Sequence, residues 1–225
     1  MNMMMNQKND FLIVALDFSQ SRQALDLVEK LPSVHFYKVG MELFYAEGHA
    51  IIDRLKSLGK KVFLDLKIND IPKTVEKSVK KLCEYQPDYL TVFCNAGGVR
   101  AALEGSSGSN TKILNVTVLT SQASEYSEVQ ARTRISLEAG AAGVICSGLE
   151  TMKLRDDFKE RDFIIVNPGI RLENSAGGDD QNRVVTPLYA LQSGATNIVV
   201  GRPITQSSNP QKTVMDIFSQ IGQVE

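Results

Sequence analysis

The segment from Asp65 to Asp70 carries the side chains best suited to chemistry. Two acids and a base, Asp65, Lys67 and Asp70, stand within six residues, directly behind an apolar run. Asp17 and Lys38 lie at the ends of two earlier apolar runs. In a pocket with little water, alternating charges keep each lysine protonated and each aspartate ionised. Such an array suits a reaction in which negative charge leaves one carbon and a proton arrives there.

A structural interpretation competes for each acid taken singly. Asp70 precedes Ile71-Pro72, and an aspartate before proline is common at the start of a helix, so Asp70 could be a helix cap. Asp65 could be a hydrogen-bond acceptor at a strand end. Neither role explains two acids and a lysine together, so the catalytic interpretation is favoured for the whole set.

A second group of residues is typical of a phosphate site. Arg171 ends the segment Pro168-Gly169-Ile170-Arg171, Gly201-Arg202 follows a later apolar run, and a glycine-containing segment, 175–181, lies between them. Glycine lets backbone N–H groups approach a ligand closely, and arginine offers a fork of donors that matches phosphate oxygens. The alternative is a flexible loop with a surface arginine.

Metal and nucleophile motifs are absent from the sequence. The two histidines, His35 and His49, have neither HxH nor HxxxH spacing, and no GxSxG, P-loop or SxxK motif occurs. A Mg²⁺ site made of Glu42, Asp65 and Asp70 stays open as an alternative.

The elements that position these residues are short apolar runs separated by segments with helical periodicity. The runs are almost continuously apolar, as in parallel strands covered on both faces. We expect eight strands: Phe11–Leu16, Phe36–Val39, Lys61–Leu64, Tyr89–Phe93, Ile113–Leu119, Gly143–Cys146, Phe163–Val166 and Asn197–Val200.

The segments between the runs have apolar residues at helical spacing. One helix face is expected to carry Phe44, Ile51, Leu55 and Leu58, a second Val75, Val79 and Leu82, and the last Val214, Ile217, Phe218 and Ile221. Glycines that would end helices stand before three of the strands, at Gly59, Gly140 and Gly194.

Eight such repeats predict a single-domain (β/α)8 TIM barrel of the α/β class over residues 11–225, behind a disordered or loosely ordered tail over residues 1–10. A doubly wound open sheet is the alternative, but the turn after the first run, Asp17-Phe18-Ser19-Gln20, lacks the usual glycines. In a barrel the chemistry lies at the carboxyl ends of the strands. Asp17, Lys38, Asp65 and Lys67 come from three adjacent strands and can therefore meet there.

Composition narrows the choice of partners and compartment. With 25 basic and 26 acidic residues, the net charge of −1 gives no reason to expect a nucleic-acid or membrane partner. Cys83, Cys94 and Cys146 are odd in number, without CxxC spacing, and lie in apolar contexts, so we expect buried free thiols. The first apolar run is too short for a signal sequence or a membrane span. A cytoplasmic location is expected.

Seven motifs together resemble the bacterial type of orotidine 5′-phosphate decarboxylase, from Phe11 to Ile221. They are VALDF (14–18), FYKVGMELF (36–44), FLDLKINDIPKTV (63–75), VTVLTS (116–121), NPGIR (167–171), GGDDQNR (177–183) and GRPIT (201–205). The resemblance implies a lyase that converts orotidine 5′-monophosphate to UMP and CO2, in de novo pyrimidine biosynthesis. It further implies a homodimer that works without metal or organic cofactor.

The resemblance also implies a role for individual residues. Lys38, Asp65 and Lys67 would form a charged network with Asp70 of a second subunit. Asp65 would disfavour the substrate carboxylate, while Lys67 stabilises the carbanion at C6 and delivers its proton.

The remaining substrate contacts are implied in the same way. Asp17 and Lys38 would contact the ribose, as would Thr74 from across the dimer; Thr120 or Ser121 would hold the pyrimidine; and the phosphate would be bound by Arg171, Gln181, Gly201 and Arg202. The sequence departs from the commoner family pattern at Asn69 and Lys73, where histidine and asparagine are usual, which concerns dimer packing and helix entry.

Two rival functions use the same motifs. Mg²⁺-dependent decarboxylases or aldolases of phosphorylated sugars share DxKxxD, but usually carry a carboxylate where Lys38 stands. A non-catalytic nucleotide- or phosphate-binding barrel would keep Arg171 and Arg202 and lack the Lys38, Asp65 and Lys67 set.

Overall fold

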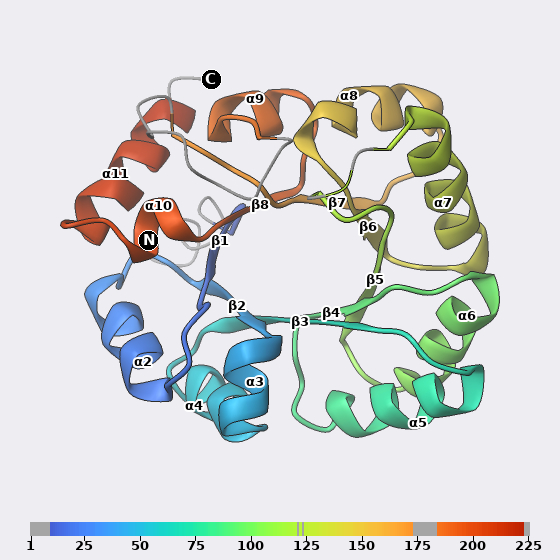
Figure 1. Ribbon diagram of the computed structural model, residues 1–225, viewed down its shortest axis with the longest axis horizontal. Helices are drawn as coiled ribbons and strands as arrows, with labels where there is room; N and C mark the ends of the chain where they lie inside the picture. The colour runs from blue at the N-terminus through green and yellow to red at the C-terminus, as the bar shows by residue number, and fades with distance from the viewer. Residues whose placement is uncertain (1–9, 121, 123, 173–183, 223–225) are drawn as a thin grey trace.

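The computed structural model describes residues 10–120, 122, 124–172 and 184–222. Eight strands form a closed sheet in which each strand pairs with its neighbours in sequence and the eighth pairs with the first. The assigned pairs are all parallel. Figure 1 shows the strands as an inner ring with the helices outside it. The predicted (β/α)8 barrel is confirmed, and the open sheet is wrong.

The strands lie close to the predicted runs. They are β1 (Leu12–Ala15), β2 (Phe36–Gly40), β3 (Lys61–Ile68), β4 (Tyr89–Val92), β5 (Lys112–Val116), β6 (Gly143–Ile145), β7 (Ile164–Asn167) and β8 (Asn197–Val200). The largest differences concern β3, which continues through Asp65 and Lys67, and β5, which ends three residues before the predicted Leu119.

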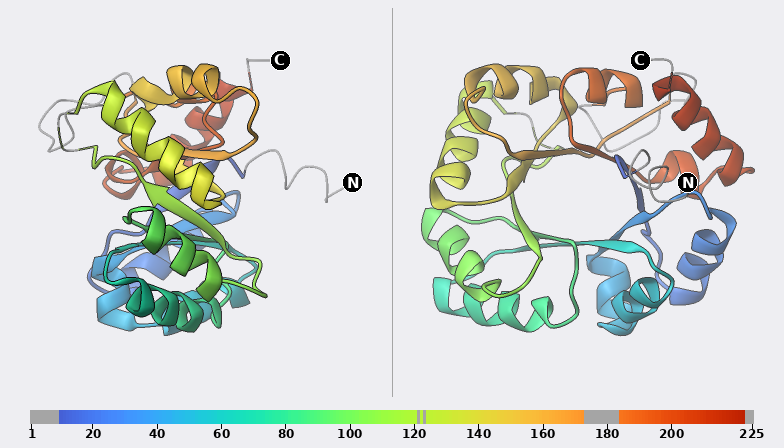
Figure 2. Two further views of the ribbon diagram at one scale, coloured as in Figure 1. Left: turned by 90° about the vertical axis from the view of Figure 1, so that its right-hand side faces the viewer. Right: turned by 180° about the vertical axis from the view of Figure 1, so that it is seen from behind.

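Helices connect the strands on the outside of the barrel. They are α2 (Ser21–Lys30), α3 (Met41–Glu47), α4 (Ala50–Ser57), α5 (Pro72–Cys83), α6 (Ala96–Gly105), α7 (Tyr126–Ala139), α8 (Gly148–Asp157), α9 (Pro187–Gln192), α10 (Arg202–Thr205) and α11 (Pro210–Ile221). The view from behind in Figure 2 shows the same ring of helices around the strands.

The three glycines predicted to end helices do so, and a fourth glycine ends a helix where the sequence predicts a continuous one. Gly59, Gly140 and Gly194 have positive φ angles of 70°, 101° and 99° at the ends of helical segments, as expected. The single helix predicted through Phe44 and Leu58 is wrong. Gly48, with φ 62°, ends α3, and a separate helix, α4, begins at Ala50.

The core consists of two apolar layers, inside and outside the ring of strands. In β1, Ile13 and Ala15 belong to the inner layer, whereas Leu12 and Val14 belong to the layer beneath the helices. Side chains of a strand alternate between its faces, and here both faces are apolar. That double burial is why the strands are continuous apolar runs in the sequence.

The remaining expectations concern the tail and the cysteines. The tail lies outside the described residues except for Asp10, which is tied to the barrel by a 2.5 Å contact with Lys61. All three cysteines are free; Cys83 and Cys146 are buried as expected, but Cys94 is only half-buried. Within the described part of the chain, no helix has the length and apolar character needed to cross a membrane.

Candidate functional site

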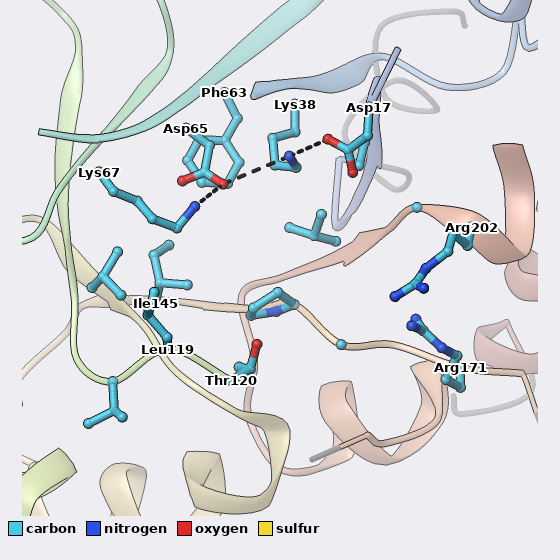
Figure 3. Close-up of a pocket in the computed structure, with 17 residues that line it drawn as sticks. Asp17, Lys38, Phe63, Asp65, Lys67, Leu119, Thr120, Ile145, Arg171 and Arg202 are labelled. Atoms are coloured by element: carbon cyan, nitrogen blue, oxygen red, sulfur yellow. Dashed lines mark hydrogen bonds and ion pairs between the residues drawn. The ribbon is translucent and has the colours of Figure 1, made fainter. Parts of the chain in front are cut away.

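A cavity of about 310 Å³ opens at the carboxyl ends of the strands. Its polar lining includes seven of the residues expected at the site, namely Asp17, Lys38, Asp65, Lys67, Thr120, Arg171 and Arg202, together with the backbone of Gly201. Figure 3 shows these side chains around the cavity. The structure therefore brings together residues as far apart in the sequence as Asp17 and Arg202.

Four of these residues, Asp17, Lys38, Asp65 and Lys67, form a line of alternating charges that we call the charged row (Figure 3). Lys38 Nζ lies 2.8 Å from Asp17 Oδ1 and 3.8 Å from Asp65 Oδ2. Lys67 Nζ donates to the same oxygen of Asp65 at 2.8 Å. A buried carboxylate is stable only when paired and hydrogen-bonded, and both conditions are met here.

Asp65 is the most buried acid of the row, with 13% of its side chain exposed, compared with 57% for Asp17. Burial alone raises the pKa of the Asp65 carboxyl group. Lys38 and Lys67, together with hydrogen bonds from Lys67 and Thr91, outweigh burial and hold that pKa below its usual value. Asp65 is thus a carboxylate at neutral pH, with an ammonium group beside it.

The other end of the cavity is cationic. Arg171 follows β7 and Arg202 begins α10. Their guanidinium groups point toward one another and into the cavity, at the end opposite Lys67 (Figure 3). We call them the arginine pair. Two guanidinium groups that face one cavity favour a doubly charged anion with several oxygens, such as a phosphate monoester.

Apolar side chains occupy the space around the two polar ends. They include Phe63, Val116, Ile145 and Val199 from four strands of the barrel, and Leu119 from the loop that follows β5. Low-polarity walls exclude water and strengthen the electrostatic interactions inside. The cavity thus offers an anion site at one end and a charged site with a buried carboxylate at the other.

Several expected residues do not line the cavity. Asp70 and Thr74 are exposed and lie at the start of α5. Asp70 is not the N-cap of that helix, because Ile71 occupies this position and no side chain caps it. The Asp70 side chain instead accepts from the Ile71 N–H. Ser121 and Gln181 lie outside the described residues, as does the glycine-containing loop.

The two departures from the family pattern lie on the surface. Asn69 and Lys73 are both exposed, and Lys73 pairs with Glu76 at 2.7 Å on its own helix. Neither residue lines the cavity.

A carboxylate metal site is not formed by these residues. Among the described residues, no three His, Cys, Asp or Glu side chains form a group that could hold a metal ion. Glu42 lies exposed on α3, and Asp70 lies outside the cavity that contains Asp65. The Glu42, Asp65 and Asp70 alternative therefore has no geometric support.

One residue of the site was not singled out from the sequence. Thr91 is fully buried in β4 and donates to Asp65 Oδ1 at 2.8 Å. The sequence offers one signal for this role: Thr91 is the one serine or threonine in the apolar run Tyr89–Phe93. Threonine is common in strands for its β-branched shape alone, so that signal is weak.

Comparisons with known proteins agree with the fold and the motifs. The family described as "Orotidine 5'-phosphate decarboxylase / HUMPS family" matches residues 10–217. An orotidine 5′-phosphate decarboxylase of Enterococcus faecalis is 43% identical, over 93% of this chain and 97% of that protein. An orotidine 5′-phosphate decarboxylase of Fusobacterium nucleatum is 42% identical, over 89% of this chain and 91% of that protein.

A solved structure is similar over nearly the same extent. The crystal structure of orotidine 5′-phosphate decarboxylase from Lactobacillus acidophilus superposes with a TM-score of 0.80 and 35% identity, covering 93% of this chain and 98% of that one. The family match over residues 10–217 includes the charged row and the arginine pair. The chain belongs to the orotidine 5′-phosphate decarboxylase / HUMPS family.

Proposed function

We propose that this protein decarboxylates orotidine 5′-monophosphate to UMP and CO2, as a step of pyrimidine biosynthesis. The observation that carries the proposal is the contact between Asp65 and Lys67 in the cavity, 2.8 Å apart with Lys38 behind them. This arrangement places a fixed negative charge and a proton donor at one point. The family membership and the names of its relatives support the same reaction.

The reaction uses the two charges in sequence. The substrate carboxylate lies against Asp65, and this repulsion is relieved when the bond between C6 and the carboxylate carbon breaks. CO2 departs, and the electron pair stays on C6, where the Lys67 ammonium group stabilises it. Lys67 Nζ then gives a proton to C6, which yields UMP, and solvent returns a proton to the amine. No cofactor enters these steps.

The other residues bind the substrate at a distance from the reacting carbon. Arg171, Arg202 and the backbone of Gly201 hold the phosphate, together with Gln181. Asp17 and Lys38 contact the ribose, and Thr120 or Ser121 contacts the pyrimidine. Binding energy from the phosphate end positions the carboxylate against Asp65 and lowers the barrier there.

A homodimer would complete the site with Asp70 and Thr74 of a second subunit. Both residues are exposed in the single chain, beside Ile71, which is 67% exposed. On α3, Tyr45 is 76% exposed and Met41 44%, and both line a surface hollow together with Asn69 and residues of α5. Large apolar side chains gathered at one surface favour burial against another chain. The charged row of one subunit would then receive a fifth member, Asp70, from the other.

The direct test is an orotidylate assay, followed by the loss of the substrate's ultraviolet absorbance, with and without EDTA. We expect turnover that EDTA does not reduce. EDTA-sensitive turnover of a keto-sugar phosphate, without turnover of orotidylate, would establish the metal-dependent rival. Binding of UMP without any turnover would instead indicate a non-catalytic barrel.

Shared sites can be tested by mixing two inactive variants, Lys67→Ala and Asp70→Asn. A mixed dimer has one site with both changes and one site with neither. Random exchange of subunits should therefore restore about one quarter of the wild-type activity. Each variant incubated alone is the control, and mixtures that stay inactive although subunits exchange would exclude the shared site.

The proposed compartment is the cytoplasm. The substrate is a soluble nucleotide, and the three cysteines are free thiols, which persist in a reducing environment.

A further inference from the structure

The pairing between β3 and β4 is irregular beside the charged row. Leu64 pairs with Leu90 and Ile68 pairs with Val92, so that three residues of β3, from 65 to 67, stand opposite the single residue Thr91. Extra residues in one strand interrupt the ladder of backbone hydrogen bonds and leave groups that need other partners. Asp65 and Lys67 are at the two ends of this interruption.

The side chain of Thr91 supplies the missing partner. Its Oγ1 accepts a hydrogen bond from the backbone N–H of Lys67 at 2.9 Å and donates one to Asp65 Oδ1 at 2.8 Å. The direction is settled by chemistry, because an amide N–H can only donate and a hydroxyl has one proton. That proton is left for the Asp65 carboxylate, which can only accept.

The two oxygens of Asp65 consequently have separate partners. Oδ1 is held by Thr91, and Oδ2 faces the ammonium groups of Lys67, at 2.8 Å, and Lys38, at 3.8 Å. One hydroxyl group thus sets how the carboxylate is turned, and with it which oxygen the lysines meet.

The backbone of Lys67 needs such support. Its φ angle is 49°, in the left-handed region that residues with a Cβ atom rarely adopt. Conformations of this kind persist where surrounding contacts hold them. Thr91 has no exposed surface, so solvent cannot readily take over the role of its hydroxyl group.

We propose that Thr91 is a positioning residue for the reaction, whose hydroxyl group fixes both the Asp65 carboxylate and the left-handed backbone of Lys67. The inference rests on the proposed function, since its consequence for catalysis requires Lys67 to deliver a proton. Thr91 does not line the cavity, so it acts through these two residues.

The test compares Thr91→Val, which keeps the shape and removes the hydroxyl group, with Thr91→Ser, which keeps the hydroxyl group. We expect kcat for orotidylate to fall about 100-fold in Thr91→Val, as for a displacement of catalytic groups by about 1 Å. Thr91→Ser should recover most of this loss. UMP lacks the carboxylate that meets Asp65, so its affinity should stay at the wild-type level in both variants.

A titration separates positioning from mere structural support. The carboxyl group of Asp65 is followed by ¹³C NMR, its signal identified by its disappearance in Asp65→Asn. The facing charges, Lys38 from β2 and Lys67 from β3, with Asp17 behind Lys38, are the same in all variants. Loss of one donor should raise the pKa of Asp65 in Thr91→Val, and Thr91→Ser should return it to the wild-type value.

The proposal is overturned if folded Thr91→Val keeps both the wild-type kcat and the wild-type pKa of Asp65. Should Thr91→Val not fold, Thr91→Cys replaces it, because a thiol is of similar size and is only a weak donor. A wild-type protein that does not turn over orotidylate refutes the proposed function instead. The titration of Asp65 still decides, in that case, whether Thr91 holds the carboxylate.

Discussion

The two ends of the cavity are built on opposite electrostatic plans. In the charged row, acids and bases alternate, and contacts of 2.8 to 3.8 Å pair each charge with an opposite one. In the arginine pair, two like charges face one another (Figure 3). Alternating charges stabilise one another within the row, whereas two guanidinium groups that face one cavity offer donors that match the oxygens of a phosphate.

This difference separates the two tasks of the proposed enzyme. Lys38 and Asp65 lie within strands and their neighbours hold them rigidly, so the reacting end is arranged before the substrate binds. Preorganised charges need no rearrangement during the reaction, which is the main source of electrostatic catalysis. Arg171 and Arg202 lie just beyond strand ends, and the task proposed for them is to attract and hold a phosphate. Substitutions at the two ends should therefore affect different kinetic constants.

The largest effect should come from Lys67→Ala at the reacting end. Removal of the proton donor and of the charge that stabilises the carbanion should lower kcat by at least about 10⁴-fold. UMP binding should stay measurable by calorimetry, since the arginine pair is intact. Lys212→Ala is the matched control, because Lys212 is an exposed lysine on α11 that pairs with Asp216 on its own helix. Undiminished turnover in Lys67→Ala would refute the mechanism.

Arg202→Ala should have a smaller effect than Lys67→Ala, and it should change KM rather than kcat. Loss of a charge-assisted hydrogen bond to phosphate should raise KM for orotidylate about 10- to 100-fold. Orotidine, which has no phosphate, should react equally slowly with the wild type and with Arg202→Ala. The exposed Arg161 offers a control of equal charge in Arg161→Ala. If Arg202→Ala instead turned over orotidine more slowly than the wild type does, Arg202 would contribute to more than phosphate binding.

The fold was predictable because a barrel buries both faces of its strands. That burial leaves apolar runs, such as Asn197–Val200, whose bounds agree with β8. Gly48 shows the limit, because the apolar spacing of Phe44 and Ile51 continues across two helices. Periodicity reports which face is buried and does not reveal a glycine that turns the chain between two short helices.

The charged row was predictable because its residues stand in or directly behind apolar runs of the sequence, where a charged side chain needs a partner or a function. Thr91 was not, because its role depends on the irregular register between β3 and β4, a property of two strands that neither sequence segment shows alone. The motif from Asp65 to Asp70 also contains two parts that the structure places in different surroundings. Its first half ends β3 inside the cavity, and Asp70, beyond the strand, is exposed at the entrance to α5.

The smallest expected effect concerns stability, and it tests whether the charged row holds itself together. The pKa of Asp65 is lowered in the folded protein, so its contribution to stability is present above the unfolded-state pKa of about 4. That contribution disappears as the pH falls through the still lower pKa of the folded state. At pH 7, Asp65→Asn should therefore lower the free energy of unfolding by about 1–3 kcal/mol, since Lys38 and Lys67 lose their shared partner.

Urea unfolding at a series of pH values measures this difference. The gap between the wild type and Asp65→Asn should narrow below pH 4, where protonated Asp65 approaches the charge of asparagine. Asp17→Asn is the control, because Asp17 also pairs with Lys38 but is 57% exposed, so its loss should cost less than about 1 kcal/mol. The two outcomes that contradict this are an equal loss of unfolding free energy in both variants and a difference between the wild type and Asp65→Asn that does not change with pH. Either result would mean that the buried Asp65 carboxylate does not stabilise the charged row. The charged row and the arginine pair would then differ only in the signs of the charges that they contain.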